Sequence, residues 1–305
     1  MSKEIWADLP NSKLTFFSAG SYELFEKQAP NVQKEIKKEF TIIEEPNDKA
    51  IKKSKKLGYL PTKSKTASVN ENRGDFLPST TQMAIDYLSS RSTNGFFLMV
   101  EGGKIDWACH GNDAATVFNE VKDMDDAIKV AYEFYKKHPK ETLIVVTADH
   151  ETGGIVLGTG KYALNLKALQ YQKHSADGLS RRISELRKSK GNKVTWEDMK
   201  EFLGEEMGFW KQFPISWEQE KKLRDEFEQS FVRNKVVFAE SMYSKSEPMA
   251  ARAKEVMDQI SMVGWVSGGH SAGYVPVFAI GAGSQLFGEK IDNTEIPKRI
   301  AKAAG

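Results

Sequence analysis

The segments Phe96-Phe-Leu-Met-Val100 and Thr142-Leu-Ile-Val-Val-Thr147 decide the fold that we predict for this chain. Each is a short apolar run of the kind that forms a fully buried strand. Between them, residues 113–137 repeat apolar side chains at spacings of three and four, which predicts a helix with one apolar face. A strand–helix–strand unit of this length normally has parallel strands and a right-handed crossover. The sequence therefore predicts an α/β fold with a mostly parallel sheet flanked by helices.

Three clusters of carboxylate and imidazole side chains adjoin the strand-like runs. Because the carboxyl ends of parallel strands lie at one edge of a sheet, we expect the first two clusters to face each other across a crevice there. Asp and His are zinc ligands, and carboxylate oxygen also suits magnesium. The clusters are Glu101, Asp106 and His110 after the first run, Asp149 and His150 after the second, and His270 just before the strand-like residues 275–280.

The spacing within the clusters favours shared metal ligation. Asp106 and His110 are four residues apart, which on a helical turn puts both side chains on one face. A third ligand such as His270 would complete a three-ligand site with an open position, the arrangement of catalytic zinc. Asp149 and His150 could hold a second metal, and two metals about 4 Å apart clamp the attacking and leaving oxygens of a phosphoryl displacement.

The composition excludes several classes of protein. The 305 residues are 40% hydrophobic and 28% charged, which is typical of a globular chain. A formal net charge of +2 gives no indication of nucleic acid binding, and no apolar run approaches the length of about 20 residues that crosses a membrane. Cys109 is the single cysteine, so an intrachain disulfide is excluded. No signal peptide is visible at Met1, which leaves the location of the protein open.

The remaining segments predict three regions. Residues 40–43 have strand character, and a helix is expected to begin at Ser79, whose hydroxyl and Gln82 form a capping-box pattern. Residues 44–75 are polar and lysine-rich, so we expect a surface excursion. The segment after residue 160 is charged and helix-rich. We expect an α/β metal-site region over 1–160, a helical insertion over 161–262 and a return to the α/β core over 263–305.

Four stretches of the chain resemble segments of the alkaline phosphatase family. Two resemble its metal-binding motifs, a third is similar to its third metal segment, and a fourth is similar to the closing segment of many bacterial members. They are Val100-Glu-Gly-Gly-Lys-Ile-Asp-Trp-Ala-Cys-His-Gly-Asn-Asp113, Thr147-Ala-Asp-His-Glu-Thr-Gly-Gly154, Gly269-His-Ser-Ala-Gly273 and Asp292-Asn-Thr-Glu-Ile-Pro297. The resemblance is firm over residues 76–158 and 264–300.

The resemblance implies a role for each matching residue. Alkaline phosphatases hydrolyse phosphate monoesters through a phosphoserine intermediate, and zinc activates both the serine and the attacking water. The implied ligands are Asp106, His110 and His270 for the first zinc, Asp149 and His150 for the second zinc, and Glu101 for magnesium.

The sequence departs from the family pattern at the nucleophile. The family places its serine in an Asp-Ser-Ala context, and no Asp in this chain is followed by Ser. The family's bridging Asp and phosphate-binding Arg also have no matching context before Glu101. We therefore expect the carboxyl-terminal portion of an alkaline phosphatase, with an incomplete core and little or no activity alone. Exposed apolar surface would then favour self-association, so a homodimer and a missing amino-terminal portion are both open as partners.

Two other functions are open at this stage. A related phosphodiesterase, sulfatase or phosphomutase shares the two-metal layout, although the uninterrupted string from Glu101 to His110 favours the phosphatase branch. A non-catalytic metal-binding or interaction module would also explain the missing serine. The resemblance implies a periplasmic or extracellular location, because the family commonly works outside the cytoplasm.

Overall fold

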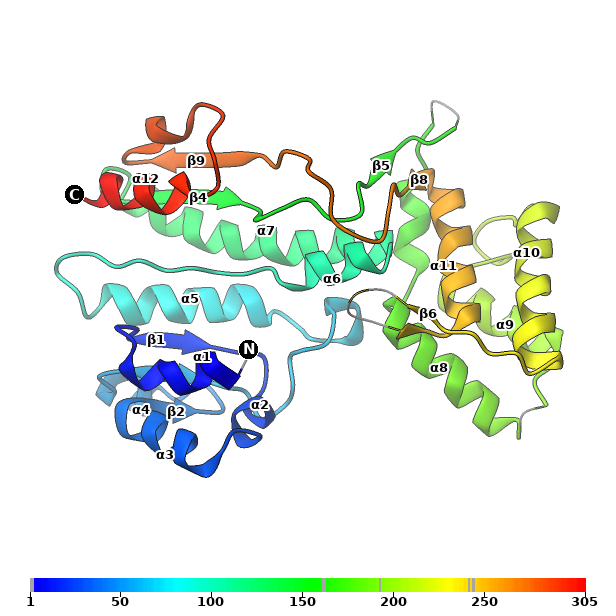
Figure 1. The fold of residues 1–305 in the computed structure, drawn as a ribbon, viewed down its shortest axis with the longest axis horizontal. Helices are drawn as coiled ribbons and strands as arrows, with labels where there is room; N and C mark the ends of the chain where they lie inside the picture. Colours follow the sequence, from blue (N-terminus) through cyan, green and yellow to red (C-terminus); the bar gives the residue numbers. More distant parts are fainter. Residues whose placement is uncertain (1–2, 161–162, 192, 241, 243–244) are drawn as a thin grey trace. The chain divides into compact units, whose positions relative to one another are not determined.

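A computed structural model describes residues 3–160, 163–191, 193–240, 242 and 245–305 (Figure 1). The chain folds into two compact units. Unit 1 comprises Met1–Glu101 and Asp123–Phe134, and unit 2 comprises Gly102–Lys122 and Tyr135–Gly305. The predicted α/β class is confirmed, because the structure combines a parallel sheet with many helices. Within the described ranges, none of the helices has both the length and the apolar character that crossing a membrane requires.

Unit 1 is built around a three-stranded parallel sheet of order β1-β3-β2, with β1 at Phe16–Ser18, β2 at Thr41–Ile43 and β3 at Leu57–Tyr59. The strand predicted at 40–43 is confirmed as β2. The surface excursion predicted over 44–75 is wrong in its centre, because all three residues of β3 are buried. Gly58 permits this close packing, since a Cβ there would lie 2.6 Å from the side chains of Phe17 and Ile42.

Short helices surround this sheet. The helix predicted from Ser79 exists but begins three residues earlier, and the Ser79 hydroxyl donates to the carbonyl of Asp75 at 2.7 Å instead of capping. The buried aromatic side chains Trp6, Phe17, Phe25 and Phe40 belong to one core cluster of the unit, and Tyr59 and Tyr87 belong to a second. The helices are α1 (Lys3–Asp8), η1 (Leu9–Asn11), α2 (Tyr22–Glu26), α3 (Pro30–Glu39), α4 (Asp48–Lys53), η2 (Val69–Glu71) and α5 (Phe76–Ser89).

Residues 96–100 do not form the predicted strand. They belong to no ladder among the described residues, and Phe97 and Met99 are each 70% exposed. An extended segment becomes a strand only when a neighbouring strand exchanges backbone hydrogen bonds with it. The predicted parallel strand–helix–strand unit is therefore wrong, although the helix after it is confirmed as α7 (Ala114–Lys137).

Unit 2 contains the second predicted strand, confirmed as β4 (Leu143–Thr147). Its partner is β9 (Val277–Gly281), which runs antiparallel and pairs its first residue, Val277, with the last residue of β4, Thr147. Two further elements, η5 (Ser284–Phe287) and α12 (Glu295–Ala304), follow β9.

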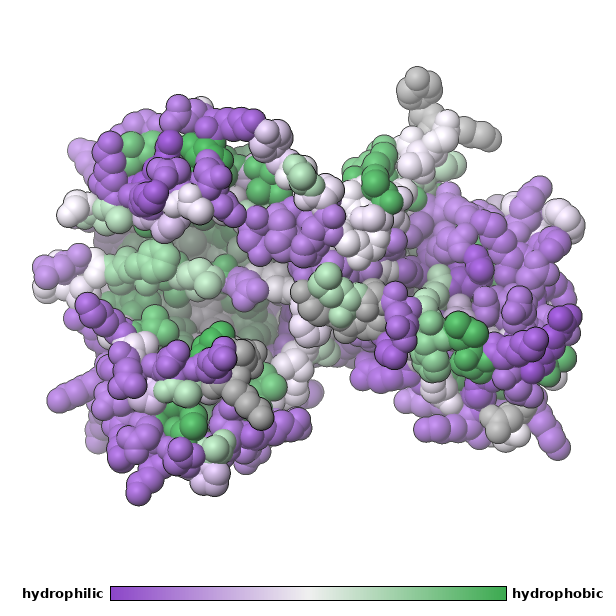
Figure 2. Space-filling model, in the orientation of Figure 1, coloured by the Kyte–Doolittle hydropathy of each residue, from purple (hydrophilic) through white to green (hydrophobic). Residues whose placement is uncertain are grey.

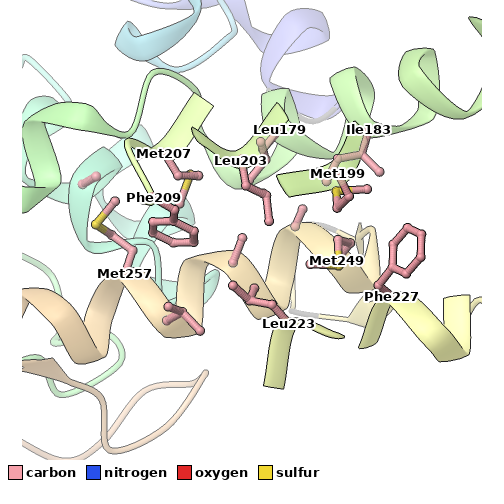
Figure 3. Packing of buried hydrophobic residues seen from close by; sticks show 14 of the residues in the cluster. Leu179, Ile183, Met199, Leu203, Met207, Phe209, Leu223, Phe227, Met249 and Met257 are labelled. Atoms are coloured by element: carbon pink, nitrogen blue, oxygen red, sulfur yellow. The ribbon is translucent and has the colours of Figure 1, made fainter. Parts of the chain in front are cut away.

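The segment from residue 163 to residue 262 is mainly helical, as predicted. Its helices enclose a dense core in which leucine, methionine and phenylalanine side chains of four helices meet (Figure 3). Thr195 and Ser216 begin two of these helices with capping boxes. The helices are η3 (Leu166–Tyr171), α8 (Ala176–Ser189), α9 (Trp196–Met207), α10 (Trp217–Phe227), η4 (Glu228–Val232) and α11 (Pro248–Ser261). The division at residues 161 and 262 stays a prediction.

Two short antiparallel pairs border the helices. β5 (Val156–Leu157) pairs with β8 (Val263–Gly264), and β6 (Ala239–Glu240) pairs with β7 (Lys245–Ser246). Figure 2 shows hydrophobic residues gathered over β5, where Ile155 and both strand residues are exposed.

Candidate metal centre

The helix α6 (Lys104–His110) carries the first two candidate ligands of unit 2. The spacing of four residues places both on one face, with Asp106 Oδ1 lying 3.5 Å from His110 Nε2. The His110 side chain is fully buried, whereas that of Asp106 is 30% exposed. The helix therefore presents one anchored imidazole and one carboxylate that solvent reaches.

The antiparallel pairing of β4 with β9 brings the other candidates toward α6. Asp149 and His150 follow the end of β4, and His270 precedes the start of β9, so the two loops leave the same end of the strand pair. A hydrogen bond of 2.8 Å from the Gly153 amide to the Gly269 carbonyl joins these loops. The predicted crevice between two parallel strand ends is therefore wrong. The candidates lie where the end of β4 is next to the beginning of its antiparallel partner, β9.

Three of the predicted ligands converge. One ligand atom from each of Asp106, His110 and His270 lies within 4.8 Å of the other two. The two imidazole Nε2 atoms are 2.9 Å apart, and His270 Nε2 is 3.8 Å from Asp106 Oδ1. The group joins residues that are separated by more than 150 positions in the sequence.

The backbone sets the protonation of the buried imidazole. His110 Nδ1 lies 2.7 Å from the carbonyl oxygen of Gly268. A carbonyl only accepts hydrogen bonds, so Nδ1 carries a proton and Nε2 is the ring nitrogen that faces the other candidate ligands. This is the arrangement by which metal-binding histidines are usually oriented, with the second ring nitrogen donating to a carbonyl or carboxylate.

The second pair of candidates lies beside this group rather than within it. The His150 ring stacks on the His270 ring with a centroid separation of 3.7 Å. Asp149 is 85% exposed, and its Oδ2 is 3.3 Å from His150 Nε2. Glu101 is exposed and belongs to unit 1, whereas the other five candidates belong to unit 2. Its role as a magnesium ligand stays a prediction.

Two residues that the sequence reasoning missed hold the site together. The Thr152 hydroxyl donates to Asp106 Oδ1 at 2.5 Å, and the Glu151 carboxylate accepts from the backbone amides of Gly154 and Ser271. Hydrogen bonds from Ser271, and then from Gly154, stabilise the ionised Glu151 carboxylate and lower its pKa. Their place directly after Asp149 and His150 is the one sequence signal that could have identified them.

The floor of the site is apolar. Cys109 is buried with Ala108 and Val117, and Trp265 packs against them, so Cys109 serves as a small packing residue beside the site. Burial, together with the nearby carboxylates of Asp106 and Glu151, raises the pKa of the Cys109 thiol to about 12. The thiol therefore stays protonated at neutral pH and does not compete with the imidazoles.

The converging donor set fits zinc. Two imidazole nitrogens, one of them oriented by a backbone carbonyl, and one carboxylate oxygen form the kind of three-ligand set that catalytic zinc sites use. Tetrahedral zinc at about 2.0–2.1 Å from each nitrogen separates the two nitrogens by about 3.3 Å. The observed separation of 2.9 Å requires a widening that exposed His270 can make by a small rotation.

Known proteins with similar sequences are alkaline phosphatases. The sequence model described as "Alkaline phosphatase" matches residues 56–305. Alkaline phosphatase 3 of Bacillus subtilis is 32% identical, covering 95% of this chain and 58% of the relative. Alkaline phosphatase 4 of the same organism is 29% identical, covering 95% of this chain and 57% of the relative. The chain thus spans slightly more than half the length of these relatives.

Solved structures give the same result. The cold-active alkaline phosphatase of Shewanella sp. superimposes with a TM-score of 0.76 at 25% identity, covering 99% of this chain and 68% of that one. A variant of the TAB5 alkaline phosphatase with Mg bound in its M3 site gives a TM-score of 0.60 at 26% identity, covering 99% and 64%. The family match over residues 56–305 takes in all six candidate ligands. This chain belongs to the alkaline phosphatase family.

Proposed function

We propose that this chain forms the zinc-binding part of a phosphate monoester hydrolase. The observation that carries the proposal is the convergence of Asp106, His110 and His270 within 4.8 Å. A zinc ion held there would act as a Lewis acid on a phosphoryl oxygen and lower the pKa of bound water.

The exposure of the three side chains supports an open coordination position. His110 is fully buried and oriented by the Gly268 carbonyl, so it would hold the ion on the buried side of the site. The side chains of Asp106 and His270 are 30% and 34% exposed, which leaves a path from solvent to the ligand atoms. A catalytic zinc requires such an open position, whereas structural zinc sites are closed by four protein ligands.

The proposal extends to a second zinc and a magnesium ion. His150, stacked on His270, would contribute its Nε2 to the second zinc together with Asp149, whose exposed carboxylate would turn inward. Glu101 would bind magnesium, a hard cation that prefers oxygen ligands. The TAB5 relative described with bound Mg supports a magnesium site in the family.

The missing nucleophile limits the activity that we propose for these 305 residues. The sequence has no Asp-Ser dipeptide, and covalent phosphoryl transfer needs an activated acceptor. We therefore propose that the chain binds zinc and turns over phosphate monoesters slowly or not at all by itself. The same observation favours a second candidate function, that of a non-catalytic metal-binding module. The periplasmic or extracellular location stays a prediction.

Zinc titration of the purified chain against a chromophoric chelator tests the proposal. We expect one tight zinc per chain, and we expect His270→Ala to weaken its binding by at least about 100-fold, since one ligand of three is lost. His138→Ala is the matched control, because this imidazole is 47% exposed and lies beside Glu141, outside the cluster. Equal zinc affinity in all three proteins would contradict the metal assignment.

An aryl phosphate assay with added zinc and magnesium tests the proposal that the chain has little activity by itself. Tight zinc binding without turnover agrees with the proposal and with the second candidate, a non-catalytic metal-binding module. Robust turnover that His270→Ala abolishes would support the metal centre and overturn the proposal of low activity.

A further inference from the structure

The Thr152 hydroxyl contacts one proposed ligand of each zinc. Its Oγ1 atom lies 2.5 Å from Asp106 Oδ1 and 3.3 Å from His150 Nδ1. Thr152 is partly buried in the turn that follows β4, whereas Asp106 lies on α6, 46 residues earlier. One side chain thus contacts a proposed ligand of the first zinc and a proposed ligand of the second.

Hydrogen-bond chemistry fixes the direction of both contacts. An ionised carboxylate only accepts, so the Thr152 proton points to Asp106 and a hydroxyl lone pair is left for His150 Nδ1. The same Nδ1 lies 3.1 Å from the carbonyl oxygen of Glu151, which also only accepts. His150 Nδ1 therefore carries a proton, which leaves Nε2, 3.3 Å from Asp149 Oδ2, as the ring nitrogen available to a metal.

The contact with Asp106 involves the more exposed of the two α6 ligands. Asp106 is part-exposed, and its Oδ1 is also the atom nearest to the imidazoles of His110 and His270. A carboxylate oxygen has two lone pairs, so Oδ1 can accept from a hydroxyl and bind a metal together. Short hydrogen bonds to ionised acceptors are strong, and threonine has a stiff χ1 because it is β-branched.

We propose that Thr152 is a positioning residue of the metal centre, which holds the Asp106 carboxylate and the His150 tautomer ready for zinc. The inference rests on the proposed function. Groups that orient metal ligands through hydrogen bonds typically change metal affinity by about 10–100-fold when removed.

Zinc affinity of Thr152→Val and Thr152→Ser tests the inference. Valine keeps the shape of threonine and removes the hydroxyl, so we expect about 10–100-fold weaker zinc binding. Serine keeps the hydroxyl, so we expect most of the affinity to be restored. The visible spectrum of the cobalt-substituted chain is the second readout, because it reports ligand geometry and should change in the valine variant and return in the serine variant.

A double-mutant cycle with Asp106→Asn shows whether Thr152 acts through Asp106 even if one variant is less stable. In the Asp106→Asn background, we expect Thr152→Val to lose most of its effect, because the carboxylate that it orients is absent. A Thr152→Val chain that binds zinc like the unchanged chain, while His270→Ala does not, would overturn this inference and leave the proposed function standing. If His270→Ala leaves zinc binding unaffected, the proposed function itself is contradicted, and the inference about Thr152 falls with it.

Discussion

The helical core and the metal centre are parts of one unit but differ in what holds them together. Among the described residues, the helical core buries twenty hydrophobic side chains, whereas the cluster beneath the metal centre buries three. Ligand atoms at the centre are held instead by hydrogen bonds to Thr152 and to the Gly268 carbonyl. Burial supplies the stability of the first region, and directed polar contacts supply the geometry of the second.

The two regions meet at α11. The Trp265 indole N–H donates to Asp258 Oδ2 at 3.0 Å, and the Lys254 ammonium donates to the Gly111 carbonyl just after α6. Trp265 also packs against the apolar floor of the centre. The helical core can thus support the loops of the metal centre without contributing a candidate ligand.

Truncation of a core leucine should give the largest loss of stability. Leu203 is fully buried among the side chains of Figure 3, so Leu203→Ala should lower the free energy of unfolding by about 2–5 kcal/mol. Denaturant unfolding followed by circular dichroism measures this change. Leu157→Ala removes the same atoms from a residue that is 48% exposed and should change it by about 0.5 kcal/mol or less. Zinc stoichiometry should be unchanged in both, and similar losses of stability would contradict the comparison.

Helices and strands whose pattern lies within one segment of the chain could be predicted from the sequence. The apolar stripe of residues 113–137 gave α7, and the β-branched run before Asp149 gave β4. The spacing of four residues placed Asp106 and His110 on one face of α6. Each of these inferences needs only the periodicity of one segment.

The pattern of a single segment does not predict which strands pair or which distant side chains contact each other. Residues 96–100 are as apolar as β4, yet only β4 has a neighbouring strand, because β9 lies beside it. The buried strand Leu57–Tyr59 is too short to show a period, and its lysine-rich surroundings concealed it. Thr152 was missed for a similar reason, since a hydroxyl reveals its role only when Asp106 lies next to it.

The buried carboxyl of Asp258 lies on α11, where the helical core meets the metal centre. It should make the free energy of unfolding depend on pH, with an effect of intermediate size. Burial raises the pKa of Asp258 to about 8 from its ordinary value near 4, against the opposing charge of Lys254. The folded protein therefore binds more protons than the unfolded chain between these values, so its stability should fall as pH rises toward 8 and then level off. The expected loss is roughly 1–3 kcal/mol once solvent penetration and local relaxation are allowed for.

Asp258→Asn isolates this contribution. The amide cannot ionise but can still accept from Trp265, so the variant should be more stable than the unchanged chain at pH 9 and similar to it at pH 5. Urea unfolding across this range measures the difference. Asp225→Asn is the control, because this carboxylate lies on α10, is 60% exposed and pairs with Lys221. If the free energy of unfolding varies with pH in both variants as it does in the unchanged chain, Asp258 is not the source of the pH dependence.

The smallest effect on stability is expected at the strand pair that leads to the metal centre. Phe278 and Ile280 of β9 are 64% and 39% exposed, and residues two apart on a strand share a face. Phe278→Thr introduces a β-branched residue, which suits a strand, and should change the free energy of unfolding by about 0.5 kcal/mol or less, because little burial is lost. It should nevertheless reduce self-association measured by sedimentation velocity, since exposed apolar faces of strands attract one another. Val237→Thr, at a residue that is 77% exposed outside any strand, should leave self-association unchanged. An equal reduction in both variants would mean that general surface hydrophobicity, rather than the β9 face, drives association.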